Sequence, residues 1–257
     1  MSDLVNYEQH DAVAVVTINR PDKMNAFTSE VSREMQLALE RAHHDDSVRV
    51  IVLTGAGRCF SAGADLKSGF DGRPVSGKLQ HEYRPVIAEV MTMPKPVIAA
   101  VHGSAAGIGM SLALSCDLMI MADDAFLLSP FTTISLLPDG GLNWLLVRQL
   151  GYRRAFQLSI ESERIEAPRC VELGLANRAV PAGELQATAL EWAQKLSARA
   201  PLSLAATKKA MRIASDSDWA SSFNLEADLQ QTLVGSADNI EGVQAFFEKR
   251  APDFKGK

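Results

Sequence analysis

The stretch Lys95–Asp117, KPVIAAVHGSAAGIGMSLALSCD, decides the fold of this chain. Residues 96–101 are continuously apolar, with β-branched side chains at Val97, Ile98 and Val101. This pattern predicts a strand that is buried on both faces. Gly103 ends the strand, and small residues that favour a helix follow from about Ala105. The step from strand to helix therefore falls on residues 103–109, GSAAGIG.

Small residues at this step let a ligand approach the backbone closely. The first N–H groups of a helix have no partner inside the helix, and they lie at the positive end of its dipole. Such a donor can hold a carbonyl oxygen on which negative charge develops. A plainer interpretation is that the glycines only let the helix pack against the sheet. The run lacks the dinucleotide pattern G-x-G-x-x-G, and all five histidines precede Ser111, which is not the residue order of a hydrolase with a G-x-S-x-G turn.

A second turn of small residues has the same character. Residues 48–54, VRVIVLT, predict another buried strand, and RCFSAGADL follows at residues 58–66. Ligands in parallel α/β sheets commonly bind at the carboxyl ends of the strands. Two such turns can therefore bring two backbone donors together. Residues 67–77 are rich in glycine and predict either a lid or a plain solvent loop.

Composition limits the class of protein. The chain has 257 residues, 47% of them hydrophobic, with a net charge of -5 and no basic stripe, which fits an α/β domain and argues against a nucleic-acid partner. Three widely spaced cysteines and a polar N-terminus predict a cytoplasmic protein with reduced thiols and no membrane segment. No residue spacing predicts a metal site.

The remaining elements alternate and then become helical. We expect strands at 12–19, 117–122 and 175–180, and helices at 28–44 with Thr28 as N-cap, 78–92, 142–150, 153–159 and 168–173. Residues 182–250 are almost wholly helical, with breaks at Pro201, 215–218 and 235–238. The apolar faces of this tail predict packing on the core or on a neighbouring subunit. Asp139, in the sequence Pro-Asp-Gly-Gly, is either a turn-and-cap residue or a catalytic acid.

Ordered motifs along the chain resemble the crotonase superfamily, the enoyl-CoA hydratases and isomerases, from about residue 11 to 255. The resemblance implies a ClpP-like ββα spiral core with an acyl-CoA site at residues 1–195. It implies a helical region at 196–257 that makes homotrimers or dimers of trimers. The matching motifs are Asn19-Arg20-Pro21, Asn25-Ala26, residues 51–55 and 60–66, residues 95–103, Cys116-Asp117, residues 173–176 and residues 245–250.

The resemblance also implies the acyl-CoA site. Its oxyanion hole would be formed by the backbone N–H groups of Ala64 and Ile108, which agrees with the two turns described above. Coenzyme A enters only as part of the substrate, and no other cofactor is expected. The positions that match coenzyme A-lining residues are Ala26, Ala62, Asp65 and Leu66.

The sequence departs from hydratases at their two catalytic glutamates, which are Ser111 and Phe131 here. Asp139 instead resembles the single acid of Δ3,Δ2-enoyl-CoA isomerases and of ring-opening isomerases of phenylacetyl-CoA breakdown. One carboxylate is enough to move a proton from C2 to C4. We therefore predict a double-bond isomerase with Asp139 as acid/base, its pKa raised by an apolar setting. The predicted acyl pocket is lined by Ser111, Phe131, Leu136 and Trp144.

Three alternatives stay open. A dehalogenase-like enzyme would use Asp139 as nucleophile together with a histidine on the helix before the central strand. That helix carries His81, but Arg84 is nearer the matching position. An atypical hydratase would activate water with Asp139 alone. A non-catalytic acyl-CoA-binding protein would need no acid.

Overall fold

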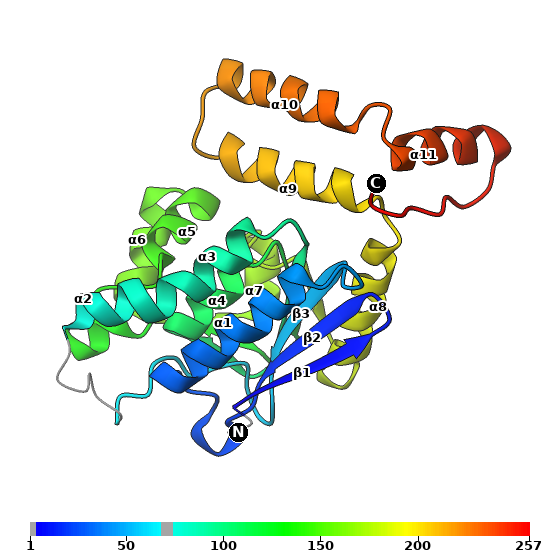
Figure 1. Ribbon diagram of the computed structural model, residues 1–257. Coiled ribbons are helices and arrows are strands. Elements are labelled where there is room, and N and C mark those ends of the chain that lie inside the picture. Colours follow the sequence, from blue (N-terminus) through cyan, green and yellow to red (C-terminus); the bar gives the residue numbers. More distant parts are fainter. Residues whose placement is uncertain (1–3, 68–73) are drawn as a thin grey trace.

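The structure is a computed structural model that describes residues 4–67 and 74–257. Its strands and helices alternate through the core and give way to helices near the C-terminus (Figure 1). The strands are β1 (Val5–His10), β2 (Val13–Ile18), β3 (Val50–Gly55), β4 (Val97–Val101), β5 (Ser104–Ala106), β6 (Leu118–Ala122), β7 (Phe126–Leu128), β8 (Ile165–Glu166) and β9 (Arg178–Val180). The α-helices are α1 (Ser29–His44), α2 (Val75–Lys78), α3 (Arg84–Thr92), α4 (Ile108–Ser115), α5 (Leu142–Leu150), α6 (Tyr152–Glu161), α7 (Ala167–Glu172), α8 (Leu185–Ser197), α9 (Pro201–Ala214), α10 (Trp219–Leu233) and α11 (Ala237–Glu248). Short turns complete the set: η1 (Pro21–Lys23), η3 (Phe131–Ile134) and η4 (Ala182–Glu184) are 3₁₀-helical, and η2 (Leu79–Tyr83) is a π-helix.

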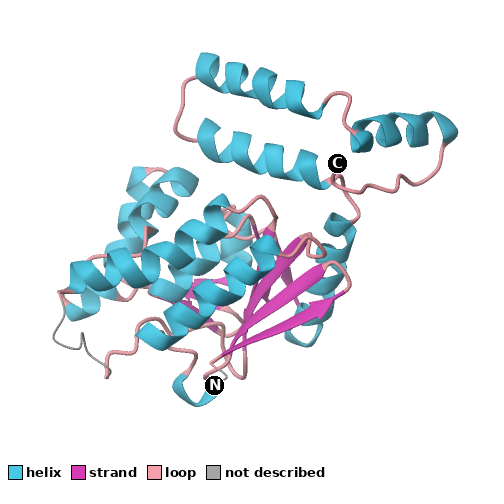
Figure 2. Cartoon of the chain, in the orientation of Figure 1, coloured by secondary structure: helices cyan, strands magenta, loops and turns pink. Residues whose placement is uncertain are grey.

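A six-stranded sheet in the order β1-β2-β3-β4-β6-β9 forms the centre of the core. All its neighbouring strands are parallel except the β1–β2 hairpin. β3 and β4 are buried at every residue, as their continuous apolar sequences predict. Helices α1, α3 and α4 lie along one side of this sheet, and α8 lies on the other (Figures 1 and 2). The five strands predicted from the sequence are present as β2, β3, β4, β6 and β9, although β9 begins only at Arg178.

A second, three-stranded sheet in the order β5-β7-β8 lies beside the first. It corrects one prediction: the helix expected from about Ala105 begins at Ile108, because residues 104–106 form β5. The sequence Ser-Ala-Ala has no strand signature. Its backbone is extended because Ser61 pairs with Ala105 on one side and β7 pairs with β5 on the other.

Two other regions differ from expectation or fall outside the description. The polar N-terminal segment forms the edge strand β1, which the sequence did not predict because its residues are only partly buried or exposed. The proposed lid at 67–77 lies mostly at residues 68–73, outside the described residues. Thr28 caps α1 as predicted, accepting from the N–H of Val31.

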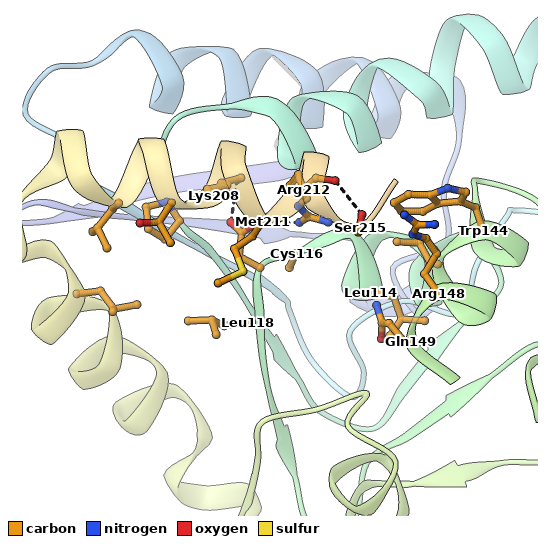
Figure 3. A pocket seen from close by; sticks show the side chains of 16 residues that line it. Leu114, Cys116, Leu118, Trp144, Arg148, Gln149, Lys208, Met211, Arg212 and Ser215 are labelled. Carbon is orange, nitrogen blue, oxygen red and sulfur yellow. Dashed lines mark hydrogen bonds and ion pairs between the residues drawn. The ribbon is translucent and has the colours of Figure 1, made fainter. Parts of the chain in front are cut away.

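The C-terminal helices stand apart from the sheet, with α9 and α10 as an antiparallel pair (Figure 1). The predicted boundary at 195/196 falls inside α8, and the chain leaves the core after Ser197. Helix α9 is held to the core by Asp117, whose carboxylate pairs with Lys208 at 2.7 Å and with Arg212 at 2.9 Å. A cavity of about 580 Å³ lies between α9 and the core (Figure 3).

Candidate active site

Two glycines bring the small-residue turns into contact. A Cβ placed on Gly107 would lie 3.7 Å from the Cα of Gly63, and one placed on Gly63 would lie 2.9 Å from the carbonyl oxygen of Ala106. Both glycines have positive φ, at 97° for Gly63 and 53° for Gly107. Larger residues would be strained there and would push the turns apart. Ala64 and Ile108, which follow these glycines, are therefore neighbours in space.

Hydrogen bonds lock this juxtaposition while leaving donors available. Ser61 N–H donates to Ser104 at 3.0 Å, and Ala106 N–H donates to Ser61 at 2.9 Å. Phe27 bonds to Gly63 and Asp65, on either side of Ala64. Within residues 4–67 and 74–257, no acceptor takes the N–H of Ala64 or that of Ile108, the first residue of α4. The two predicted oxyanion donors therefore belong to neighbouring turns, one after β3 and one after β5, and neither is used within the described fold.

The loop that carries Asp139 lies against the first turn of α4. Ser111, fully buried, donates to the backbone carbonyl of Asp139 at 3.0 Å and also approaches the carbonyl of Gly107 at 3.3 Å. A Cβ on Gly140 would lie 2.5 Å from Cδ1 of Ile108. The loop, the serine and the donor-bearing residue are therefore packed as one unit.

The carboxyl group of Asp139 is in an environment that favours proton transfer near neutral pH. Burial raises the pKa of Asp139 to about 6. A carboxyl with this pKa is both protonated and deprotonated to useful extents under ordinary conditions. His81 and Arg84, the candidates of the dehalogenase-like alternative, are both exposed, and Arg84 bonds to Gln80.

Three of the predicted coenzyme A positions lie in the second turn, and Ala26 lies in the loop after η1. Ala26 is buried, whereas Ala62 and Leu66 are exposed. Asp65 pairs with Arg20 at 3.1 Å and accepts from the N–H of Lys67, so its carboxylate stabilises the turn.

The four predicted acyl-pocket residues do not all lie at the same place in the structure. Ser111 and Phe131 are buried beside the site, with Cζ of Phe131 3.7 Å from a Cβ placed on Gly107. Leu136 is half-exposed. The structure places Trp144 elsewhere: it lines the cavity beneath α9 with its ring beside Arg148 (Figure 3). The reason is helical rotation, because α5 buries Leu142, Leu145 and Leu146 and turns residue 144 away from that face.

Sequence reasoning missed Tyr83. The Asp139 charge contributes to the raised pKa of this buried phenol, so the two side chains are electrostatic neighbours. The segment before Tyr83 is polar, LQHEY, and gives no sign of a π-helical turn. The available signal was only an aromatic residue on the helix that precedes the central strand.

The chain matches a known protein family over nearly its whole length. The family model of enoyl-CoA hydratase/isomerase matches residues 8–257. The chain belongs to the enoyl-CoA hydratase/isomerase family. It is an enzyme of the crotonase superfamily that acts on acyl-CoA, and its core and helical C-terminal region have the crotonase fold.

Individual relatives carry different reaction names. A probable enoyl-CoA hydratase of Rhodobacter capsulatus is 40% identical over 254 residues, covering 98% of each chain. The 1,2-epoxyphenylacetyl-CoA isomerase of Escherichia coli is 35% identical over 100% of both chains. The crystal structure of an enoyl-CoA hydratase from Bacillus anthracis matches with a TM-score of 0.93 at 32% identity, covering 99% of this chain and 100% of that one. Family membership therefore establishes the acyl-CoA chemistry in general, while the names include both hydratase and isomerase.

Among the described residues, no helix is long and apolar enough to cross a membrane.

Proposed function

We propose that this enzyme moves a C=C bond of an acyl-CoA thioester from C3 to C2, with Asp139 as its acid/base. The observation that carries the proposal is the half-buried carboxyl of Asp139, with a pKa of about 6, on a loop packed against the residue that supplies an oxyanion donor. The two positions that, by resemblance, match the catalytic glutamates of hydratases hold Ser111 and Phe131.

The reaction needs one proton and one place for negative charge. The N–H groups of Ala64 and Ile108 donate hydrogen bonds to the thioester oxygen, which stabilises the enolate by about 3 kcal/mol for each donor. The Asp139 carboxylate removes a proton from C2, and the C2–H electron pair delocalises into a dienolate through the C3=C4 bond. The same carboxyl returns the proton to C4, leaving a C2=C3 bond. No water or second acid is consumed, and no added cofactor is required.

Hydration is the second candidate, because the Rhodobacter capsulatus relative is named a probable hydratase. A hydratase would have to activate water with Asp139 and find another proton donor. Ser111 is not free for that task, since its hydroxyl donates to the Asp139 backbone. We therefore expect hydration to be much slower than isomerisation.

One experiment separates the two. Purified enzyme is given 3-hexenoyl-CoA and, separately, crotonyl-CoA, and formation of the 2-enoyl thioester and loss of the conjugated double bond are followed by absorbance. We expect rapid isomerisation that Asp139→Asn lowers by about 10³-fold, within the range for a lost general base, with coenzyme A binding retained. Normal turnover by Asp139→Asn would eliminate the proposed base, and rapid hydration of crotonyl-CoA would favour the hydratase.

We also propose that the C-terminal region joins copies of this chain into a trimer or a dimer of trimers. Trp219, Phe246 and Phe247 are 77–78% exposed in the single chain. Trp219 pairs with Phe223 at the start of α10, and Phe246 pairs with Phe247 at the end of α11, and such exposed aromatic pairs fit self-association surfaces. Light scattering during size-exclusion chromatography tests this, and a monomer at micromolar concentration would contradict it.

A further inference from the structure

Tyr83 is a buried phenol that the proposed isomerisation does not use. It is the last residue of η2, a π-helical turn between α2 and α3. Single π-helical turns are rare and are frequent at functional sites, because they change the direction in which the following side chain points. Only 4% of Tyr83 is exposed.

The surroundings of Tyr83 connect it to the turn that carries Ala64 and to Asp139. Its ring meets that of Phe27 edge-on, with centroids 6.3 Å apart and an interplanar angle of 82°. Phe27 in turn bonds to the residues on either side of Ala64. The charge of Asp139 also acts on the phenol and contributes to its raised pKa. Tyr83 therefore packs on the residue that pairs with the Ala64 turn and lies within the electrostatic reach of the proposed base.

The phenol of Tyr83 is a hydrogen donor without a described acceptor. Burial, then the charges of Asp139 and Glu82, raise the pKa of Tyr83, which keeps the hydroxyl protonated at all ordinary pH values. Within the part of the chain that the structure describes, no hydrogen bond joins this hydroxyl to Asp139 or to any other group. In the proposed function, the acyl carbons beyond the thioester lie beside these two side chains.

We propose that Tyr83 determines substrate specificity by donating its phenol hydrogen to an oxygen atom on the acyl chain. The favoured substrates are acyl-CoA thioesters that bear a ketone, ether, epoxide or hydroxyl oxygen beyond the thioester, and plain hydrocarbon chains are disfavoured. A hydrocarbon chain would displace water from the phenol and leave its donor unpaired, which costs about 1–3 kcal/mol. Sites built around such a donor reject analogues that lack the matching acceptor. This inference rests on the acyl site of the proposed function.

The test uses pairs of saturated thioesters in which a methyl group in one member takes the place of a ketone oxygen in the other. Calorimetry compares 4-oxopentanoyl-CoA with 4-methylpentanoyl-CoA, and 5-oxohexanoyl-CoA with 5-methylhexanoyl-CoA. We expect wild-type enzyme to bind the ketone of at least one pair about tenfold more tightly, the ratio that corresponds to about 1.4 kcal/mol. Tyr83→Phe should abolish that preference without lowering the affinity for the hydrocarbon thioester of the pair. Tyr152→Phe, which alters an exposed phenol on α6, is the matched control and should keep it.

Two results would overturn the inference: equal wild-type affinity within both pairs, or an undiminished preference in folded Tyr83→Phe. Equal weakening of both members of a pair would overturn it as well, because the phenol would then only pack. The wild-type comparison needs no variant, so a folding defect in Tyr83→Phe does not prevent a decision. These thioesters have no C=C bond to move, so their binding is independent of the isomerase proposal, which Asp139→Asn turnover decides separately.

Discussion

The hydroxyl of Ser111 donates to the backbone carbonyl of Asp139 across 3.0 Å. Ser111 is on the first turns of α4, whose first residue, Ile108, supplies one of the two proposed oxyanion donors. The hydrogen bond therefore fixes the distance between the group that would move the proton and the group that would hold the negative charge. The short side chain of Ser111 thus holds the loop that carries Asp139.

Replacing Ser111 with alanine should lower kcat about tenfold and leave KM nearly unchanged. The loop would keep its fold but lose the bond that places the carboxyl, and a tenfold loss corresponds to about 1.4 kcal/mol of transition-state stabilisation. Ser115→Ala is the control, because that equally buried hydroxyl bonds to Leu112 within α4. Steady-state kinetics on 3-hexenoyl-CoA measures both, and equal kcat values for the two variants would show that Ser111 only packs.

The pH dependence of kcat/KM should follow the ionisation of Asp139. The base must be deprotonated in the free enzyme, so kcat/KM should rise with pH, pass its midpoint at about 6 and level off above that value. An Asp with its ordinary pKa of 3.8 would give a flat profile above pH 5. Initial rates between pH 5 and 8, on enzyme shown to stay folded over that range, distinguish the two curves.

The free energy of unfolding should also depend on pH because of the buried Asp139 carboxyl, and the direction of that dependence follows from its raised pKa. The pKa of Asp139 is raised in the folded chain, so the folded state binds more protons than the unfolded state between pH 3.8 and about 6. The stabilisation from this group is present below pH 3.8 and is lost as pH rises through 6. Asp139→Asn should therefore be more stable than wild type by about 1–2 kcal/mol at pH 7.5, allowing for partial exposure, and by only about 0.5 kcal/mol or less at pH 4.

Urea unfolding at the two pH values measures this difference. Asp123→Asn, which changes an exposed carboxylate, is the control and should show no such pH-dependent gain. A wild-type protein as stable as Asp139→Asn at pH 7.5 would mean that the carboxyl is solvated.

Gly140 and Gly141 allow backbone strain to be separated from steric contact. Both have positive φ, at 63° and 81°, but only at Gly140 would a Cβ collide, with Ile108 and Ser111. Gly140→Ala should displace the Asp139 loop and lower kcat by about 10²-fold, the scale expected for a misplaced catalytic group. Gly141→Ala should cost stability of about 1 kcal/mol and leave kcat close to that of wild type. Similar kcat values for the two variants would contradict this account of the loop.

Asp117→Asn should loosen α9 from the core. Lys208, only 8% exposed at its side chain, and Arg212 would both lose their charged partner. Removing one partner of a buried ion pair lowers the free energy of unfolding by about 3–5 kcal/mol. Because Arg212 is partly exposed, we expect a loss near about 3 kcal/mol. Asp216→Asn breaks a pair with Arg148 in which the carboxylate is largely exposed, and it should cost less than 1 kcal/mol. Chemical unfolding of both variants tests the order, and equal losses would be evidence against a structural role for Asp117.

Local sequence was sufficient for the parts of the fold that have strong patterns. Continuous apolar runs predicted β3, β4 and β6, and Thr28 predicted the start of α1. Edge and short strands were not predictable in this way. β1 is polar, and β5 is Ser-Ala-Ala, so their extended backbone depends on the strands that pair with them.

For the site, the sequence by itself determined the two glycine-containing turns and the presence of an acid at residue 139 between a proline and two glycines. These are properties of residue type and order along the chain. Only the tertiary structure decided that Gly63 lies against Gly107, that Ser111 holds the Asp139 loop, that Trp144 lines the cavity beneath α9 and that Tyr83 packs on Phe27. The physical reason is that each of these relations joins residues from different elements, and the direction of a side chain across such a contact is set by helix rotation and strand pairing rather than by neighbouring residues in the sequence.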